Sequence, residues 1–129
     1  MKKTFFALLL LCLFFMAFTC NDANSLPIED DEKELMALRQ TIEELVNTSV
    51  CHENTECRFI AFGSKACGGP KSYLIYSTSI DGEKLKTLVE SYNQKDADFN
   101  RKHGIISDCA LVNPPASLSC ENNICVAIY

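Results

Sequence analysis

Hydrophobic residues recur at helical spacing in the stretch that follows residue 27. They stand three or four residues apart, at Leu35, Leu38, Ile42 and Leu45. Four acidic residues at 29–32 precede them, where the dipole of a helix favours negative charge. The pattern predicts a helix over 28–48, with one hydrophobic face that packs against other elements.

A second stretch has the same periodicity and clearer end signals. Its hydrophobic positions are Leu85, Leu88, Val89, Tyr92 and Phe99. Asp81 stands where an N-cap is needed, and Ile80 and Leu85 can pack around it as a hydrophobic staple. Basic residues fill 101–103, and Gly104 follows at the position where helices often end. These signals predict a second helix over 82–103.

Shorter stretches are rich in strand-forming residues. The first two, 58–62 and 73–77, flank the turn Cys67-Gly68-Gly69-Pro70. A third strand is predicted over 105–112, before two prolines, and a fourth over 124–129, after a turn at 122–123. The fold expected is α+β, with two helices packed on one small, mostly antiparallel sheet of three or four strands. The expected core consists of Leu35, Leu38, Ile42, Phe59, Leu74, Leu85, Leu88, Phe99 and Leu111.

The N-terminal residues have the layout of a secretory signal peptide. Two lysines precede an unbroken apolar run over 5–18, which is short for a membrane span. Cys20 follows at the cleavage point and resembles the lipobox cysteine of bacterial lipoproteins, which is lipidated. We therefore expect a signal peptide over 1–19, a tether over 20–27 and a single domain over 28–129. Cleavage after Ser25 is the alternative, and it would remove Cys20.

The negative net charge argues against two classes of binding partner. The sequence has 12 basic and 17 acidic residues, and removal of 1–19 takes away two lysines, which leaves 10 − 17 = −7. A chain this acidic is not expected to bind nucleic acid or the surface of anionic lipid. We expect its membrane partner to be reached through the lipid on Cys20, and its other partner to be a protein.

Six cysteines remain after Cys12 and Cys20 are set aside: Cys51, Cys57, Cys67, Cys109, Cys120 and Cys125. An even set in an exported chain of this size predicts three disulfides. Many pairings are open. We favour the pair Cys67–Cys109, which closes a loop around the second helix. The other two bonds are expected among the remaining four cysteines, in a pairing that the sequence does not determine.

Motifs for chemistry are scarce. The sequence has no Cys-x-x-Cys and no hydrolase or phosphate-binding motif, and only Cys120 and Cys125 have the spacing of metal ligands. His52 is expected in an exposed loop, and His103 at the end of a helix. No cofactor, metal or catalytic residue is therefore predicted, and the expected class is a non-catalytic binding module.

The turn at Cys67 is the most distinctive local feature. Gly68 and Gly69 permit a positive φ, Pro70 restricts the next residue, and a disulfide would hold the loop. A preorganised loop of this kind suits a binding module or, as an alternative, an inhibitor of a protease or other hydrolase. Two further alternatives remain: the turn only connects two strands, or the protein is a periplasmic enzyme or thiol-redox protein.

Three segments carry a resemblance, namely CGGP at 67–70, YLIYS at 73–77 and SDCA at 107–110. With the C-terminal Cys-x4-Cys, they are similar to small, uncharacterised exported bacterial proteins described as lipoproteins. The similarity covers about 51–125. It implies an exported, disulfide-bonded domain in the cell envelope, the periplasm or the extracellular space, and brings no activity or binding residues.

Overall fold

A computed structural model describes residues 27–129 of the chain. The predicted signal peptide, Cys20 and the tether as far as residue 26 lie outside the described residues. Helix α2 spans Pro27–Asn47 and helix α3 spans Gly82–His103, each within one residue of its predicted bounds. The strands are β1 (Cys57–Phe62), β2 (Ser72–Ser77), β3 (Ser117–Glu121) and β4 (Ile124–Ile128).

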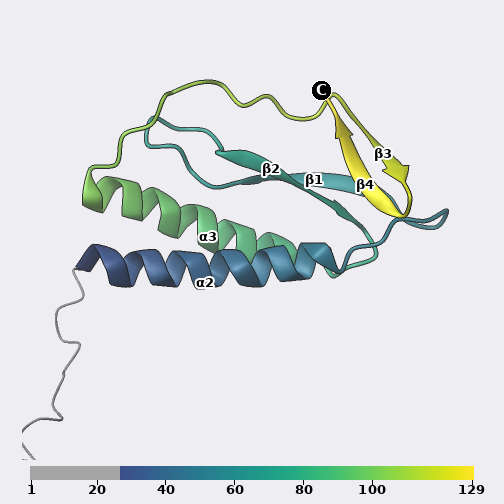
Figure 1. The fold of residues 1–129 in the computed structure, drawn as a ribbon, viewed down its shortest axis with the longest axis horizontal. Helices are drawn as coiled ribbons and strands as arrows, with labels where there is room; N and C mark the ends of the chain where they lie inside the picture. Colours follow the sequence, from purple (N-terminus) through teal and green to yellow (C-terminus); the bar gives the residue numbers. More distant parts are fainter. Residues whose placement is uncertain (1–26) are drawn as a thin grey trace, which may run out of the picture.

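The two helices pack side by side and run in opposite directions, and the β1–β2 hairpin lies along them (Figure 1). The β3–β4 hairpin lies beyond β1 and β2, at the end of the molecule where α2 finishes. A long segment without helix or strand connects α3 to β3 and passes over the other side of the first hairpin. The helices therefore form one layer, and the hairpins with this segment form the rest.

Helix α3 begins and ends where the sequence predicts. The side chain of Asp81 accepts a hydrogen bond from the main-chain N–H of Lys84 at 2.9 Å. At the other end Gly104 adopts the left-handed conformation, with φ 61°, and its N–H donates to the carbonyl of Asn100. Both contacts satisfy main-chain groups that a helix terminus leaves unpaired.

The strands form two separate antiparallel sheets of two strands each, which corrects the prediction of one sheet. In the first, Ile60 lies opposite Leu74. In the second, Cys120 lies opposite Cys125, and the turn between them places Asn122 and Asn123 at φ 51° and 65°. Two successive positive φ values are typical of the tight turn that joins such hairpins.

The predicted third strand over 105–112 was wrong. Those residues have no strand pairing, and the strand that does form, β3, lies five residues further on. The local preference of 105–112 for a strand is not realised because no neighbouring strand edge receives it. β3 has few strand-forming residues, and it forms because the turn after it returns β4 alongside.

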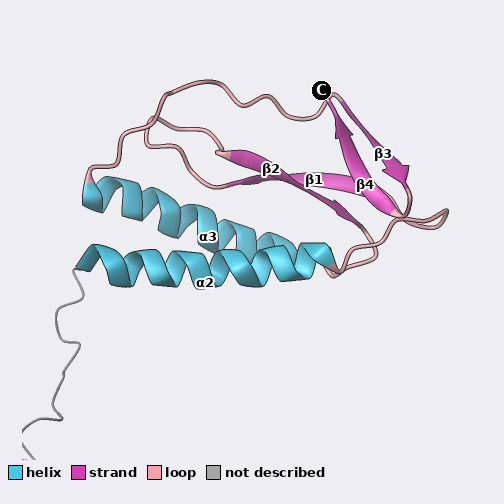
Figure 2. Cartoon of the chain, in the orientation of Figure 1, coloured by secondary structure: helices cyan, strands magenta, loops and turns pink. Residues whose placement is uncertain are grey.

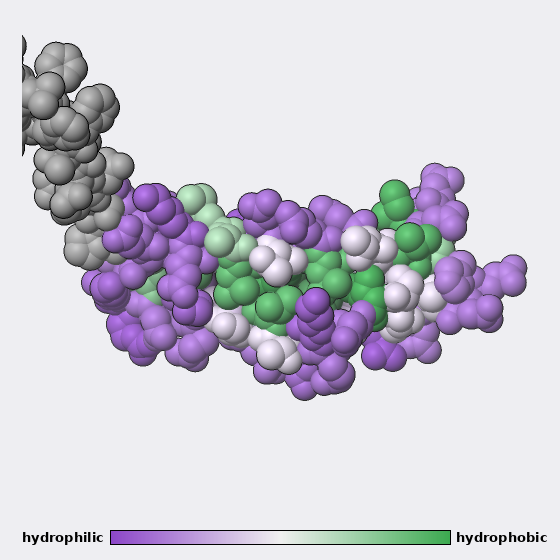
Figure 3. Space-filling model, turned by 90° about the horizontal axis from the view of Figure 1, so that it is seen from below, coloured by the Kyte–Doolittle hydropathy of each residue, from purple (hydrophilic) through white to green (hydrophobic). Residues whose placement is uncertain are grey.

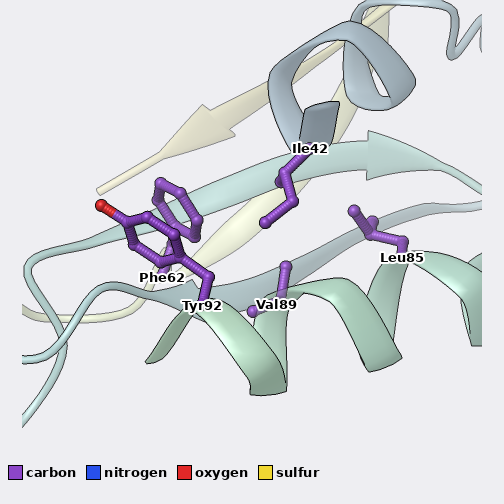
Figure 4. Packing of buried hydrophobic residues seen from close by; sticks show 5 residues of the cluster. All are labelled: Ile42, Phe62, Leu85, Val89 and Tyr92. Atoms are coloured by element: carbon purple, nitrogen blue, oxygen red, sulfur yellow. The ribbon is translucent and has the colours of Figure 1, made fainter. Parts of the chain in front are cut away.

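Five hydrophobic residues form the buried core: Ile42, Phe62, Leu85, Val89 and Tyr92 (Figure 4). The rings of Phe62 and Tyr92 stack with centroids 4.5 Å apart, and the guanidinium of Arg39 lies 5.8 Å from the Phe62 ring. Ile42 and Leu85 confirm the predicted core. Leu35, Leu38, Leu74 and Leu88 are only partly buried and pack around it.

Three of the predicted core residues lie elsewhere. Phe59 and Leu111 were wrongly predicted, because they are 42% and 87% exposed. Phe99 is half-buried and packs against the ring of His103 at the end of α3. Seen from the helix side, a band of hydrophobic residues runs along the middle of the molecule between hydrophilic margins (Figure 3). Hydrophobic side chains that surround the buried core therefore remain partly exposed on this face.

All six predicted cysteines are paired in three disulfides, Cys51–Cys120, Cys57–Cys125 and Cys67–Cys109. The last pair confirms the favoured pairing. The first two join the β3–β4 hairpin to β1 and to the chain just before it, with Cα atoms 5.9 and 5.5 Å apart. These bonds hold the second hairpin on the first, although the hairpins share no ladder of hydrogen bonds.

Candidate binding surface

Helix α3 holds the loop between β1 and β2 through three polar side chains. The Oδ1 atom of Asn93 accepts the N–H of Gly63 at 2.7 Å, and Oδ2 of Asp96 accepts the N–H of Ser64 at 2.8 Å. One turn further, Nδ2 of Asn100 donates to the carbonyl of Ser64 at 2.6 Å. Asp96 and Asn100 are buried, so the start of the loop is fixed to the core side of the helix.

Lys71 completes this anchor at the other end of the loop. Its Nζ atom donates to Oδ1 of Asp96 at 2.8 Å, which pairs the buried carboxylate with a cation. Gly63 packs against the same lysine, since a Cβ built at this glycine would lie 2.9 Å from Cβ of Lys71. The loop therefore leaves β1 and enters β2 at positions that the helix sets.

The outermost part of the loop, residues 66–69, is called the tip here, and all four residues are exposed. Gly68 and Gly69 have φ values of 96° and 83°, so both use the freedom that glycine has. The N–H of Gly68 donates to the carbonyl of Lys65, and the N–H of Lys65 donates to the carbonyl of Gly69. Pro70 is half-buried behind the tip. The tip is a closed turn with little side-chain surface.

Residues 104–116, which connect α3 to β3, are called the strap (Figure 2). Its first part is held where the N–H of Ile105 donates to the carbonyl of Asn100 at 2.9 Å. Its last part is held by the buried Pro115 and by the N–H of Ala116, which donates to the carbonyl of Ile128 at 2.8 Å. The strap has neither helix nor strand, changes direction at Cys109, whose φ is 52°, and is fixed at both ends.

Two further contacts fix the strap in the middle. The disulfide from Cys67 ties the tip to Cys109. Beside it, Nζ of Lys65 donates to Oδ1 of Asp108 at 2.8 Å and to the carbonyl of Ala110 at 2.6 Å. The Lys65 side chain is only 12% exposed, whereas Asp108 is 72% exposed. The hydrogen bond from Lys65 holds the pKa of the Asp108 carboxyl below its usual value of 3.8, so this contact persists at neutral pH.

The strap carries the two most exposed large hydrophobic side chains among residues 27–129. Ile106 is 93% exposed and Leu111 is 87% exposed, on either side of the disulfide. Neither residue was predicted to be exposed, because the strand-like sequence around both suggested burial. The paired prolines at 114–115 were the only local sign that the segment leaves the sheet.

A shallow depression of about 460 Å³ lies between the loop and the end of α3. Its lining includes Ser64, Lys65, Gly68, Asn100, Arg101 and Ile105. Asn100 contributes the one buried side-chain atom of the described residues without a hydrogen-bond partner, its Oδ1. The depression separates the tip from the end of α3.

The predicted site residues thus fall into three groups. The structure brings the predicted tip residues Gly68 and Gly69 together with Cys67 and Cys109. It places the other four cysteines at the hairpin junction, where the sulfur atoms of Cys51, Cys57 and Cys125 lie within 4.8 Å of one another. Those sulfurs belong to disulfides and are not thiolates. Cys20 lies outside the described residues.

The two histidines lie in unrelated surroundings. His52 is exposed before β1, where its Nδ1 atom accepts the N–H of Asn54 at 3.3 Å. His103 ends α3, and its Nε2 atom lies 2.7 Å from Oδ2 of Asp31 on α2. The same Oδ2 atom accepts a hydrogen bond from Nζ of Lys102 at 2.6 Å. Lys102 and His103 together lower the pKa of the Asp31 carboxyl. This group joins the ends of the two helices.

Comparisons with family models, with curated proteins and with solved structures found no match to this chain. Across residues 27–129, neither helix has the combination of length and hydrophobicity that a membrane span requires.

Proposed function

We propose that this protein is an exported, non-catalytic binding module that engages a protein partner through the tip and the strap. We further propose that a lipid on Cys20 anchors it to a membrane of the cell envelope. The three disulfides support the compartment, because such bonds persist in oxidising environments outside the cytoplasm. The N-terminal pattern of 1–20 supports export and lipidation.

One observation carries the binding role: Ile106 and Leu111 are almost fully exposed on a strap that is fixed at both ends and in the middle. Removal of two exposed hydrophobic side chains from water by a partner would favour binding. A segment that is already ordered loses little conformational entropy when it binds. The strap therefore has the properties of a recognition surface.

The test is capture of a partner in the cells that make this protein. A tagged full-length chain is crosslinked in intact cells and compared with the double variant Ile106→Ser, Leu111→Ser. The matched control is Ile124→Ser, Ile128→Ser, which removes two hydrophobic side chains that are 62% and 49% exposed on β4. All three chains are checked for equal abundance and equal thermal unfolding.

We expect the strap variant to lose a crosslinked species at least tenfold, while the control retains it. A species that the strap variant retains in full, or the absence of any species specific to the tagged chain, would contradict the proposed function.

A further inference from the structure

We propose that the partner is an endopeptidase with an apolar primary pocket, and that the strap occupies its substrate cleft with Leu111 as the anchoring side chain. This inference rests on the proposed function and specifies its partner. It also moves the inhibitory element from the tip, where the sequence suggested it, to the strap. Gly68 and Gly69 offer no side chain to fill a pocket, whereas Leu111 does.

The main chain around Leu111 is available for pairing. The N–H groups of Ile106, Leu111 and Val112 have no hydrogen-bond partner within residues 27–129. An extended chain with free main-chain groups is what a partner recognises when it adds a strand to its own edge. Peptidases bind their substrates as extended chains, and the side chain that enters the primary pocket sets specificity. An exposed leucine matches a hydrophobic pocket.

The anchors explain why the strap would inhibit rather than serve as an ordinary substrate. Hydrolysis would add one water across the peptide bond between Leu111 and Val112 and leave a carboxylate and an amine. The new carboxyl end would stay attached through Cys109 and Lys65. The new amino end would stay attached through Pro115 and Ala116. Neither product leaves the cleft readily, so the enzyme stays occupied.

The experiment uses chymotrypsin as the probe, because its primary pocket is a hydrophobic slot. Hydrolysis of a small chromogenic substrate is measured against increasing amounts of the intact, oxidised protein. Three variants are compared with it: Leu111→Gly, Leu111→Lys and Ile124→Gly. We expect inhibition by the natural chain and by Ile124→Gly, and at least a 100-fold loss with Leu111→Gly.

The Leu111→Lys variant makes the test specific. It should inhibit trypsin, whose pocket holds an aspartate, and it should lose inhibition of chymotrypsin. A simple loss of folding cannot produce this exchange. Rapid cleavage of the oxidised chain, or no inhibition of chymotrypsin, would overturn the inference. If strap-dependent capture in cells is nevertheless observed, the proposed function stands and only the class of partner is wrong.

Discussion

At the scale of single residues, the polar side chains of α3 account for the placement of the proposed binding surface. Asn93, Asp96 and Asn100 recur every three or four residues, which puts them on one face of the helix. That face is turned toward the β1–β2 loop, and the three side chains bind its main chain. The sequence alone did not single them out, because a polar residue gives no sign of which main-chain group it will contact.

Replacement of the buried carboxylate tests this anchor. Asp96→Ala leaves the N–H of Ser64 and the ammonium of Lys71 without their partner, so we expect a loss of about 2–3 kcal/mol in the free energy of unfolding. Asp98→Ala removes an exposed carboxylate two residues away, and its cost should be within about 0.5 kcal/mol. Urea denaturation measures both. Equal losses would mean that Asp96 is not an anchor.

The glycines offer a second residue-scale prediction. Gly63→Ala should destabilise the fold by about 1–2 kcal/mol from its positive φ, with a further cost from contact with Lys71. Gly82→Ala, at the first residue of α3, has open space around it and should be neutral or stabilising by up to about 1 kcal/mol. We expect the unfolding midpoint of Gly63→Ala to be the lower of the two. The reverse order would refute the assigned role of Gly63.

At the scale of elements, prediction succeeded where local signals were complete. Helix α3 has its cap, its periodicity and its terminal glycine within its own sequence, so its bounds could be read directly. The strap has only a local preference for a strand, and its real conformation depends on Lys65 and Cys67, which lie more than 35 residues earlier. The prediction of a single sheet was wrong for a similar reason. Which strands pair depends on which strand edges lie side by side in the folded protein, and local sequence does not determine that.

The junction between the two helices gives a prediction about acid. Because Lys102 and His103 lower the pKa of Asp31, its contribution to stability is present above the usual value of 3.8 and is lost as the pH falls below it. Asp31→Asn should therefore make unfolding less dependent on pH below about 4. The control Glu32→Gln removes an equal charge from an exposed neighbour. Thermal unfolding measured between pH 2 and 7 distinguishes the two variants. If their unfolding temperatures depend on pH in the same way, the proposed contribution of Asp31 to acid stability is wrong.

At the scale of the whole molecule, covalent bonds compensate for a small core. Among residues 27–129, only five hydrophobic residues form the buried cluster, and the hydrophobic band on the helix side is partly exposed (Figure 3). A domain of about this size buries a limited share of its surface, and disulfides are a common remedy. The Cys67–Cys109 bond, whose residues are 42 apart, is expected to stabilise the fold by about 4 kcal/mol in the chain-entropy treatment.

A measurement on the intact molecule tests export, lipidation and oxidation together. We expect protein extracted from its native cells to begin at Cys20, to carry the mass of a lipid there, and to take up no alkylating reagent until it is reduced. Cys20→Ala should abolish the lipid and move the protein from the membrane fraction to the soluble fraction. An unlipidated chain, or one that is alkylated without reduction, would refute this assignment.

The pairing of the cysteines has a consequence for how the chain matures. Cys51 and Cys57 are synthesised well before Cys120 and Cys125, which lie 69 and 68 residues further along. The two early thiols are close together in the chain and can be oxidised to each other first. Such a bond must be exchanged before the last hairpin can dock. Oxidation of neighbouring cysteines in the order of synthesis therefore gives a different pairing from the native one, and a chain that forms the early bond reaches the native state only by exchange of disulfides.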